Sequence, residues 1–397
     1  MAFFRNTSVN LLNLHYGIHA LALTGGGAFF TVYLVRAGVG VPGAMLALAA
    51  IVMGRFIVRP VLVGLAVRFG TRRMVITGSL LSASQYFLLA DVHGIGIQLA
   101  VLCLVSSLGE ALYWTAYHAY FAALGDSEHR GHQISAREAI AAIVGIVSPL
   151  IAGWILVHYG PRIAFAVTAM IVGLSAVPLG WTPDVAVARV SPGAWRAAMS
   201  GLVLFLADGW IAAFYYFAWQ IALFLSLKEN FLAYGGALAL AAVVGAVSGM
   251  VLGRSIDSGH GRRAAAFAYG VFAIIVVLRA TALHSATLAV AANALGAFGA
   301  CLYTPTVMTA VYNMAKRSPC TMRFHVVTEA GWDLGAAAGL SLCAFLVWRG
   351  APLWSCILLS LAGAAAGFVM IWRYYGANPS VAVQPGIVPI ESPANPV

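Results

Sequence analysis

Long apolar segments follow one another along the sequence from about residue 10 to residue 375. Each runs for about 20 to 30 residues, the length that an α-helix needs to cross roughly 30 Å of hydrocarbon. Only 9% of the 397 residues are charged, whereas soluble proteins have about 25%. The ten-residue alternation of barrel strands is absent. Because backbone groups in lipid must be satisfied within the membrane, we expect an all-α membrane protein.

Charged residues, glycine and proline divide the chain into twelve expected transmembrane helices. They lie approximately at residues 10–36, 42–67, 73–91, 95–124, 132–158, 160–181, 197–226, 230–257, 261–282, 284–316, 322–349 and 351–375. We expect an N-terminal six-helix bundle (1–181), a cytoplasmic linker (182–196) and a C-terminal six-helix bundle (197–375). The proline-rich residues 376–397 are expected to form a disordered cytoplasmic tail.

Basic residues are distributed unevenly between the two ends of these helices. The side of the N-terminus has 15 Lys and Arg residues, and the opposite side has four. Cytoplasmic loops carry such an excess, which predicts a bacterial inner-membrane protein with both termini in the cytoplasm. The net charge of +10 does not indicate nucleic-acid binding, because the basic residues form no single patch.

A weak internal repeat relates the two halves. Arg72-Arg73 and Leu112-Tyr113 recur 190 residues later as Arg262-Arg263 and Leu302-Tyr303, and Glu138-Ala139 recurs after 191 residues. Matches in the same order at nearly the same spacing predict two copies of a six-helix unit, related by a pseudo-two-fold axis.

The sequence has no nucleophile elbow, phosphate-binding loop or group of residues with metal-ligand spacing. Its five cysteines form no paired framework. We therefore expect neither enzymatic activity nor a cofactor.

Two loops carry a recognisable motif. The loop after the second helix reads VGLAVRFGTRR (63–73), and the loop after the eighth reads GRSIDSGHGRR (253–263). Both are similar to G-x-L-a-D-R-x-G-R-R/K, the signature of the major facilitator superfamily, which the chain resembles over residues 10 to 375. In the first loop Val67 occupies the aspartate position, whereas the second loop has Asp257.

The resemblance implies that these loops form a cytoplasmic gate whose ion pairs break and form again during transport. Asp126 or Glu138 can replace the missing aspartate, and Glu329 can pair with Arg323 in this gate. Arg68 and Arg73 also fit a simple positive-inside anchor. The expected gating residues are Arg68, Gly70, Arg72, Asp126, Arg130, Glu138, Asp257, Arg262, Arg263 and Glu329.

The fifth helix contains GIVSPLIAG (145–153), which is similar to the antiporter motif of the same family. Pro149 and Gly153 match that motif, while Ser148 and Ala152 replace glycines. Small residues here allow close packing against the eighth helix. The match favours export over import, although Pro149 also fits a simple kink.

Ionisable side chains within a membrane are costly and mark functional sites. Glu110 lies near the middle of the fourth helix, and Asp208 lies roughly 17 Å deep in the seventh. Arg55 lies at mid-depth and needs an anionic partner, which can be Glu110, Asp208 or a substrate carboxylate or phosphate. The expected substrate- or proton-binding residues are His19, Arg55, Glu110, Tyr113, Trp114, Tyr117, His118, Asp208, Tyr215, Trp219, Asn293, Tyr303 and Asp333.

Three polar residues have a simpler interpretation. Arg59 and Arg279 lie nearer the helix ends, from which a long side chain can reach the membrane surface. Asn293 can bond across helices without contacting a substrate.

The resemblance implies a central cavity between helices 1, 4, 7 and 10, and transport by alternating access. We expect a monomeric secondary active transporter of a small solute in the lipid bilayer. Glu110 or Asp208 is expected to carry a coupling proton, and export is favoured. The alternatives are an importer or facilitator of a small organic anion or sugar, and a non-transporting sensor or assembly protein. A cavity at the level of Glu110 and Asp208 would favour transport.

Overall fold

The computed structural model describes residues 6–124, 130–252 and 261–377, without the side chains of residues 122, 130–142 and 250–252. These ranges contain helices and no β-strand. The elements before the linker are α1 (Thr7–Thr24), η2 (Gly26–Phe29), α2 (Phe30–Leu34), η3 (Val35–Val39), α3 (Gly40–Phe69), α4 (Thr71–Ala90), α5 (Ile97–Leu124), α6 (Arg130–Ser175) and η4 (Val177–Trp181). Those after it are α7 (Ala194–Ala197), α8 (Met199–Ala212), η5 (Ala213–Ala218), α9 (Trp219–Ser226), α10 (Phe231–Leu252), α11 (Gly261–Ala282), α12 (Ala286–Arg317), α13 (Thr321–Trp348), α14 (Leu353–Leu358) and α15 (Ser360–Ala377).

Nine helical stretches of the described chain are long and apolar enough to cross a membrane. Two of them contain a break in the helix. Thr7–Phe69 has φ angles of 86° at Gly38 and 73° at Gly40, and Ile143–Trp181 has 80° at Gly160. Residues with a Cβ rarely adopt such angles, so glycine allows one helix to end and the next to begin there. The chain is a multi-pass membrane protein.

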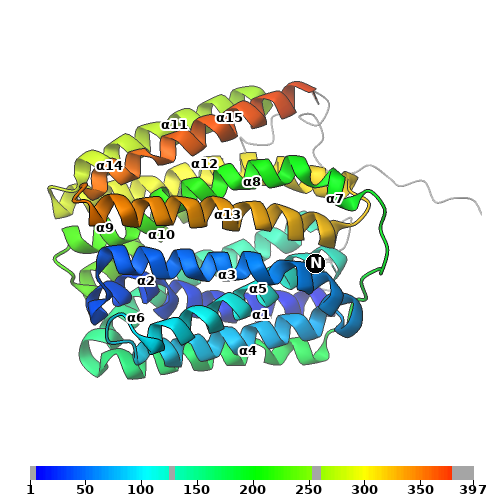
Figure 1. The fold of residues 1–397 in the computed structure, drawn as a ribbon, viewed down its shortest axis with the longest axis horizontal. Coiled ribbons are helices and arrows are strands. Elements are labelled where there is room, and N and C mark those ends of the chain that lie inside the picture. The colour runs from blue at the N-terminus through cyan, green and yellow to red at the C-terminus, as the bar shows by residue number, and fades with distance from the viewer. Residues whose placement is uncertain (1–5, 125–129, 253–260, 378–397) are drawn as a thin grey trace, which may run out of the picture.

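Helix packing occurs mainly within each half of the chain. In the first half, α1 contacts α6, and α5 contacts α3 and α4; in the second, α8 contacts α13 and α15, and α12 contacts α10 and α11. Two extensive contacts join the halves, one between α3 and α13 and one between α6 and α10. Figure 1 shows α3 and α13 side by side in the middle of the bundle.

Three glycines spaced four residues apart bring α13 close to α8. A Cβ on Gly331 or Gly335 would overlap the backbone of α8, and one on Gly339 would lie 2.6 Å from an α8–η5 side chain. Small residues at this spacing let two helices approach closely in a membrane. Because the glycine face of α13 packs on α8, Glu329 and Asp333 of α13 can contact α3.

One interhelical hydrogen bond occurs twice at related positions. Cys103 of α5 donates to the carbonyl oxygen of Ala47 on α3 over 3.6 Å. Asn293 of α12 donates to the carbonyl oxygen of Ala237 on α10 over 3.1 Å. The partners are 56 positions apart in both cases, and the second pair follows the first by 190 residues. The helix pairs α3–α5 and α10–α12 therefore pack in the same register.

Candidate functional site

Two arginines one turn apart on α3 are the centre of a buried ion network. Arg55 lies 3.0 Å from Glu110 of α5 and 3.0 Å from Asp333 of α13. Its distance to Glu329 of α13 is 3.7 Å. Arg59 forms ion pairs with Glu329, at 3.3 Å, and with Asp333. The network therefore joins α3 and α5 of the first half to α13 of the second.

Burial divides this network into a closed part and an open part. The side chains of Arg59 and Asp333 are 1% and 0% exposed, whereas that of Glu110 is 30% exposed. Charges removed from water are tolerated only when they are paired and hydrogen-bonded. Arg59 also donates to the Thr115 hydroxyl over 2.8 Å. The expectation that Arg59 reaches the membrane surface is wrong, because its partners lie deep on α13.

Asp208 on α8 lies beside this network but outside it. It accepts hydrogen bonds from the Tyr303 hydroxyl, at 2.6 Å, and from the Trp332 indole N–H, at 3.1 Å. It forms no ion pair with any residue of the described ranges. The guanidinium of Arg55 lies 5.2 Å from the centre of the Trp332 ring. Trp332 therefore separates the arginine from Asp208, which is not the partner of Arg55.

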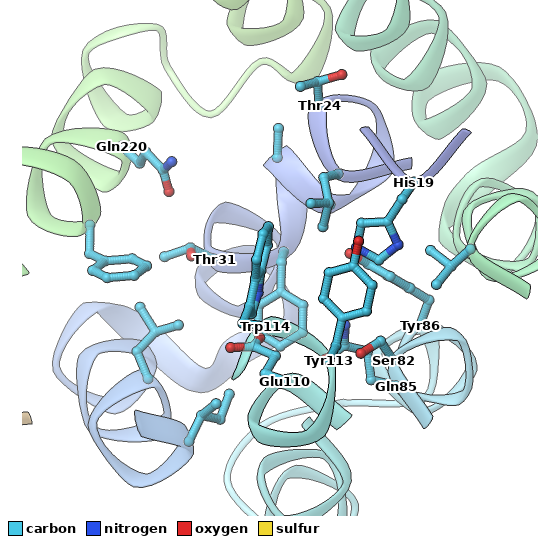
Figure 2. Close-up of a pocket in the computed structure, with 18 of the residues that line it drawn as sticks. His19, Thr24, Thr31, Ser82, Gln85, Tyr86, Glu110, Tyr113, Trp114 and Gln220 are labelled. Carbon is cyan, nitrogen blue, oxygen red and sulfur yellow. The ribbon is translucent and has the colours of Figure 1, made fainter. Parts of the chain in front are cut away.

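Two cavities meet at the ion network. The first has a volume of about 440 Å³ and contains His19, Gln85, Glu110 and Tyr113 in its lining, with Gln220 from the second half. In Figure 2, Gln220 lies across the open space from His19 and Tyr113, and the carboxylate of Glu110 lies close to the ring of Trp114. A cavity of this size falls in the usual range of small-molecule sites, about 300–1,000 Å³.

The second cavity, of about 290 Å³, lies on the other side of Arg55. Asp208, Glu329 and Trp332 line it together with His118 and His325. Arg55 and Trp114 line both cavities. The two cavities together reach the levels of both Glu110 and Asp208.

Two histidines of α1 pack against the aromatic face of α5. His15 contacts the Tyr113 hydroxyl at 3.1 Å and the Ser175 carbonyl oxygen at 2.6 Å. His19 stacks on the Tyr113 ring with 4.1 Å between ring centres. The Nδ1 atom of His19 is buried and has no hydrogen-bond partner in the described part of the chain. Tyr117 stacks on Tyr113 one turn further along α5.

Tyr215, Trp219 and Asn293 lie away from both cavities. Arg279 donates to the Tyr215 carbonyl oxygen over 2.7 Å, and its guanidinium lies 4.0 Å and 4.7 Å from the ring centres of Tyr215 and Trp219. The Trp219 indole N–H donates to Asn293 over 3.0 Å. Arg279 is only 4% exposed. The expectation that it reaches the membrane surface is wrong, because these two rings and the Tyr215 carbonyl enclose it.

Several cavity residues were missed in the sequence. Ser82 and Gln85 lie one turn apart on α4, and Gln220 and His325 lie on α9 and α13. Polar residues at helical spacing within an apolar segment were a usable signal for Ser82 and Gln85. Thr115 has no such signal, because a threonine can bond to the carbonyl of its own helix.

The linker contacts the first signature loop. Asp184 accepts a hydrogen bond from the backbone N–H of Arg72 over 3.0 Å, as a cap of α4, and Arg72 donates to the Thr182 carbonyl over 2.7 Å. Gly70 has a φ of 79°, and a Cβ there would overlap the Asp184 carboxylate. An acidic residue of the linker thus contacts the loop that lacks its aspartate. Arg68 packs over the ring of Phe69.

Other expected gating residues are only partly described. Asp126 and Asp257 lie outside the described residues, as do the side chains of Arg130 and Glu138. Arg262 donates to the Trp372 carbonyl over 3.2 Å, and Arg263 is exposed. Arg323 donates to the linker carbonyls of residues 188 and 189 over 3.0 and 2.8 Å. The expected Arg323–Glu329 pair is wrong, because Glu329 instead contacts the α3 arginines.

A family model described as Major Facilitator Superfamily matches residues 14–319. The chain belongs to the major facilitator superfamily. Two solved structures share its fold. One is a peptide transporter POT in complex with sulfate, with 17% identity, a TM-score of 0.60, and coverage of 94% of this chain and 95% of that one. The other is a POT family transporter in complex with a thioalcohol-conjugated peptide, with 12% identity, a TM-score of 0.63, and coverage of 94% and 96%.

No curated protein of similar sequence was found. The likeness to the two solved structures establishes the fold, and the family identifies a membrane transporter. The chain, as a major facilitator protein, therefore has a small-molecule substrate and works in a lipid bilayer.

In this major facilitator protein, α6 and α10 meet at the segment that resembles the antiporter motif. A Cβ on Gly153 would lie 2.9 Å from the Phe231 carbonyl oxygen, and one on Gly235 would overlap the Pro149 carbonyl. Nearby, the Tyr234 hydroxyl donates to the Ala28 carbonyl oxygen at 3.5 Å. The two halves therefore approach closely along this segment.

Proposed function

We propose that the chain crosses the membrane twelve times, as two six-helix bundles (1–181 and 197–375) joined by the linker 182–196, with a tail at 376–397. The nine apolar stretches become eleven when the two broken ones are divided at Gly38–Gly40 and at Gly160. With α4 the number is twelve. The hydrogen bonds repeated at a spacing of 190 residues support the two-bundle layout. The charge bias supports cytoplasmic termini in a bacterial inner membrane.

The proposed activity is proton-coupled secondary transport of a small solute by alternating access, in the direction of export, by a monomer. One observation carries it. Glu110 lines the first cavity, and its carboxylate forms an ion pair with Arg55. Arg55 in turn forms an ion pair with Asp333 of the other half. A change in the charge of Glu110 alters the attraction between the halves, which couples a proton to the conformation.

Export is supported by the close approach of α6 and α10 around Pro149 and Gly153. Asp208 is the second proposed proton site, because it has hydrogen-bond donors and no cationic partner among the described residues. It faces the second cavity, while Glu110 faces the first. A proton can therefore be exchanged at two levels of the pathway. The gate is proposed to include Arg68, Gly70, Arg72 and the linker.

The test is proton movement in proteoliposomes that contain the full chain, with a pH-sensitive dye inside. Solutes from three classes (organic amines, organic acids and sugars) are added in turn under an imposed pH gradient. We expect one class to release the gradient, and expect Glu110→Gln with Asp208→Asn to abolish this release. Asp91→Asn, which changes an exposed surface acid paired with Arg162, is the matched control. Gradient-driven transport that persists in the double variant would contradict proton coupling through these acids.

Import or facilitated diffusion of a small organic anion is the second candidate. Its support is Arg55, which lines both cavities. Accumulation of an anion inside the vesicles without any response to the imposed pH gradient would favour it. A non-transporting sensor is not favoured, because the cavities reach the levels of Glu110 and Asp208.

A further inference from the structure

Both terminal nitrogens of Arg55 are already paired with carboxylates of the protein, whereas its Nε atom is buried without a hydrogen-bond partner among the described residues. One terminal nitrogen lies 3.0 Å from Glu110, and the other lies 3.0 Å from Asp333 and 3.7 Å from Glu329. An anion that binds these terminal nitrogens would have to displace a carboxylate that belongs to the protein. Among the described residues, the edge of the guanidinium formed by these two nitrogens is therefore not open to an anion.

The open hydrogen-bonding atoms of the same cavity include acceptors. Glu110 bonds Arg55 through Oε2, and its Oε1 has no partner in the described ranges. Gln85 Oε1 is buried and also has no hydrogen-bond partner among the described residues. Buried polar atoms without partners are rare, and each one needs a ligand or water to satisfy it. Gln85 Oε1 is such a buried atom, and the partly exposed carboxylate of Glu110 adds a second acceptor. The cavity therefore favours a ligand that carries N–H donors.

The net charge of the ion network also favours a ligand with a positive charge. Three carboxylates, from Glu110, Glu329 and Asp333, face two guanidiniums, from Arg55 and Arg59. The network thus has one carboxylate in excess when all five groups are charged. Of the three acids, Glu110 lines the first cavity. Burying an uncompensated charge is costly, so the network gains from a proton or a cation at Glu110.

Aromatic side chains surround the cavity above this carboxylate. Tyr86, Tyr113, Trp114 and Phe217 contribute to the lining, and Figure 2 shows the Trp114 ring beside Glu110. Ring faces attract cations, and their apolar area binds the body of an aromatic ligand.

From these contacts we propose that the substrate class is an organic ammonium ion with an aromatic body, bound by Glu110 in competition with the coupling proton. This inference rests on the proposed transport function and names the ligand of that cavity. The ammonium group donates to Glu110 Oε1 and Gln85 Oε1, and the rings of Trp114 and Tyr113 contact the body. Since one carboxylate holds either a proton or the ammonium, binding of one releases the other.

Other titratable groups near Glu110 belong to five packed elements. They are His19 of α1, Arg55 and Arg59 of α3, Tyr86 of α4, Tyr113 and His118 of α5, and His325, Glu329 and Asp333 of α13. His19 faces the same cavity, so its contribution to pH dependence has to be separated from that of Glu110. A His19→Gln variant makes that separation.

The experiment measures binding by isothermal titration calorimetry to the full chain in lipid nanodiscs. The probes are three amines with matched carboxylates: tryptamine and indole-3-propionate, phenethylamine and 3-phenylpropionate, naphthylethylamine and naphthylpropionate. We expect at least one amine to bind at least tenfold more tightly than its carboxylate partner. Its affinity should fall at least tenfold between pH 8 and pH 5.5, and this dependence should persist in His19→Gln.

Variants then assign the effect to the carboxylate. Glu110→Gln should weaken amine binding at least tenfold and remove the pH dependence, whereas Glu110→Asp, which keeps the charge, should retain most of both. Asp91→Asn should bind as the unchanged protein does. Thermal melting and size-exclusion profiles show that each variant is folded.

Three results would overturn the inference: no amine of the panel binds, a carboxylate binds as tightly as its amine, or Glu110→Gln binds the amine unchanged. The proteoliposome assay separates this failure from failure of the proposed function. Proton-coupled movement of an organic acid would overturn the amine assignment and keep the transporter. Amine binding through Glu110 with no proton movement would keep the binding site and reject proton coupling.

Discussion

Arg59 on α3 and Asp333 on α13 form a buried ion pair although 274 positions separate them in the sequence. The side chains are 1% and 0% exposed, and the pair connects the two halves of the transporter. Arg55 and Glu329 lie beside it and form the same type of connection. The buried ion pairs between the halves in the described residues therefore lie at one level of the α3–α13 contact.

Replacement of one partner should destabilise the protein more than replacement of both. Asp333→Asn leaves the buried charge of Arg59 with fewer partners, and breaking such a pair costs roughly 3–5 kcal/mol. The double variant Arg59→Met with Asp333→Leu should recover a large part of this loss, because it removes both charges. Thermal melting of the purified variants in detergent checks the order. A double variant that melts at or below the temperature of Asp333→Asn would contradict it.

The exposed pair of Arg36 and Glu229 joins the two halves at 3.0 Å. An exposed pair contributes only about 0.2–1 kcal/mol. Reversing the charge of Arg36 should therefore shift the equilibrium between closed and open forms of the first cavity by about one and a half- to fivefold. We expect Arg36→Glu to raise the alkylation rate of a cysteine placed at Thr31, which lines the first cavity. Adding Glu229→Lys should restore the original rate, and an equal rate in all three proteins would exclude a role for this pair.

Gly335 and Gly173 form a matched pair of glycines in helices. A Cβ on Gly335 would overlap the α8 backbone, whereas one on Gly173 would meet nothing within 4 Å. Gly335→Ala should therefore cost about 1–3 kcal/mol by overpacking, and Gly173→Ala should be neutral or slightly stabilising. Melting temperatures of the two variants test this. Equal effects would mean that α8 and α13 do not pack as closely as described.

The α4 cap should depend on Asp184. Asp184→Ala removes the acceptor for the backbone N–H of Arg72 and should cost about 0.5–2 kcal/mol, the usual effect of losing a helix cap. Gly70→Ala should be more damaging, because it adds a Cβ at a positive φ and against the Asp184 carboxylate. In the double variant the backbone strain and the lost hydrogen bond remain, but the overlap with the carboxylate does not. Its loss of stability should therefore be smaller than the sum of the two single losses. Strict additivity in melting experiments would contradict the contact.

The sequence predicted most of the helical segments, because each can be recognised by itself. Apolar length indicates a membrane helix without any knowledge of its neighbours. Glu110 was one of three partners that the sequence allowed for Arg55, beside Asp208 and a substrate anion, because a charge at mid-depth needs an opposite charge. The structure pairs Arg55 with Glu110. The pairing of Arg59 with α13 was not predictable, since its position along α3 also allows the side chain to reach the surface.

Contacts of the linker were beyond prediction for a different reason. Asp184 lies in a polar stretch where any acidic residue would look like an ordinary solvated charge. Its role depends on the path of the chain across the start of α4, which no local pattern records. The partners of Arg279 were hidden in the same way, because two of them are aromatic rings and one is a backbone carbonyl.

The linker also limits how far the start of α4 and the start of α13 can move apart. Residue 185 accepts a hydrogen bond from Thr71 at the start of α4, and residue 188 accepts one from Arg323 on α13. Only three peptide steps separate these two anchors, and an extended chain spans at most about 3.6 Å a step, or roughly 11 Å. While both hydrogen bonds are present, residue 185 at the start of α4 and the carbonyl bound to the Arg323 guanidinium cannot separate beyond this length. A larger separation requires one of the two hydrogen bonds to break. A longer linker would allow the same separation with both hydrogen bonds intact.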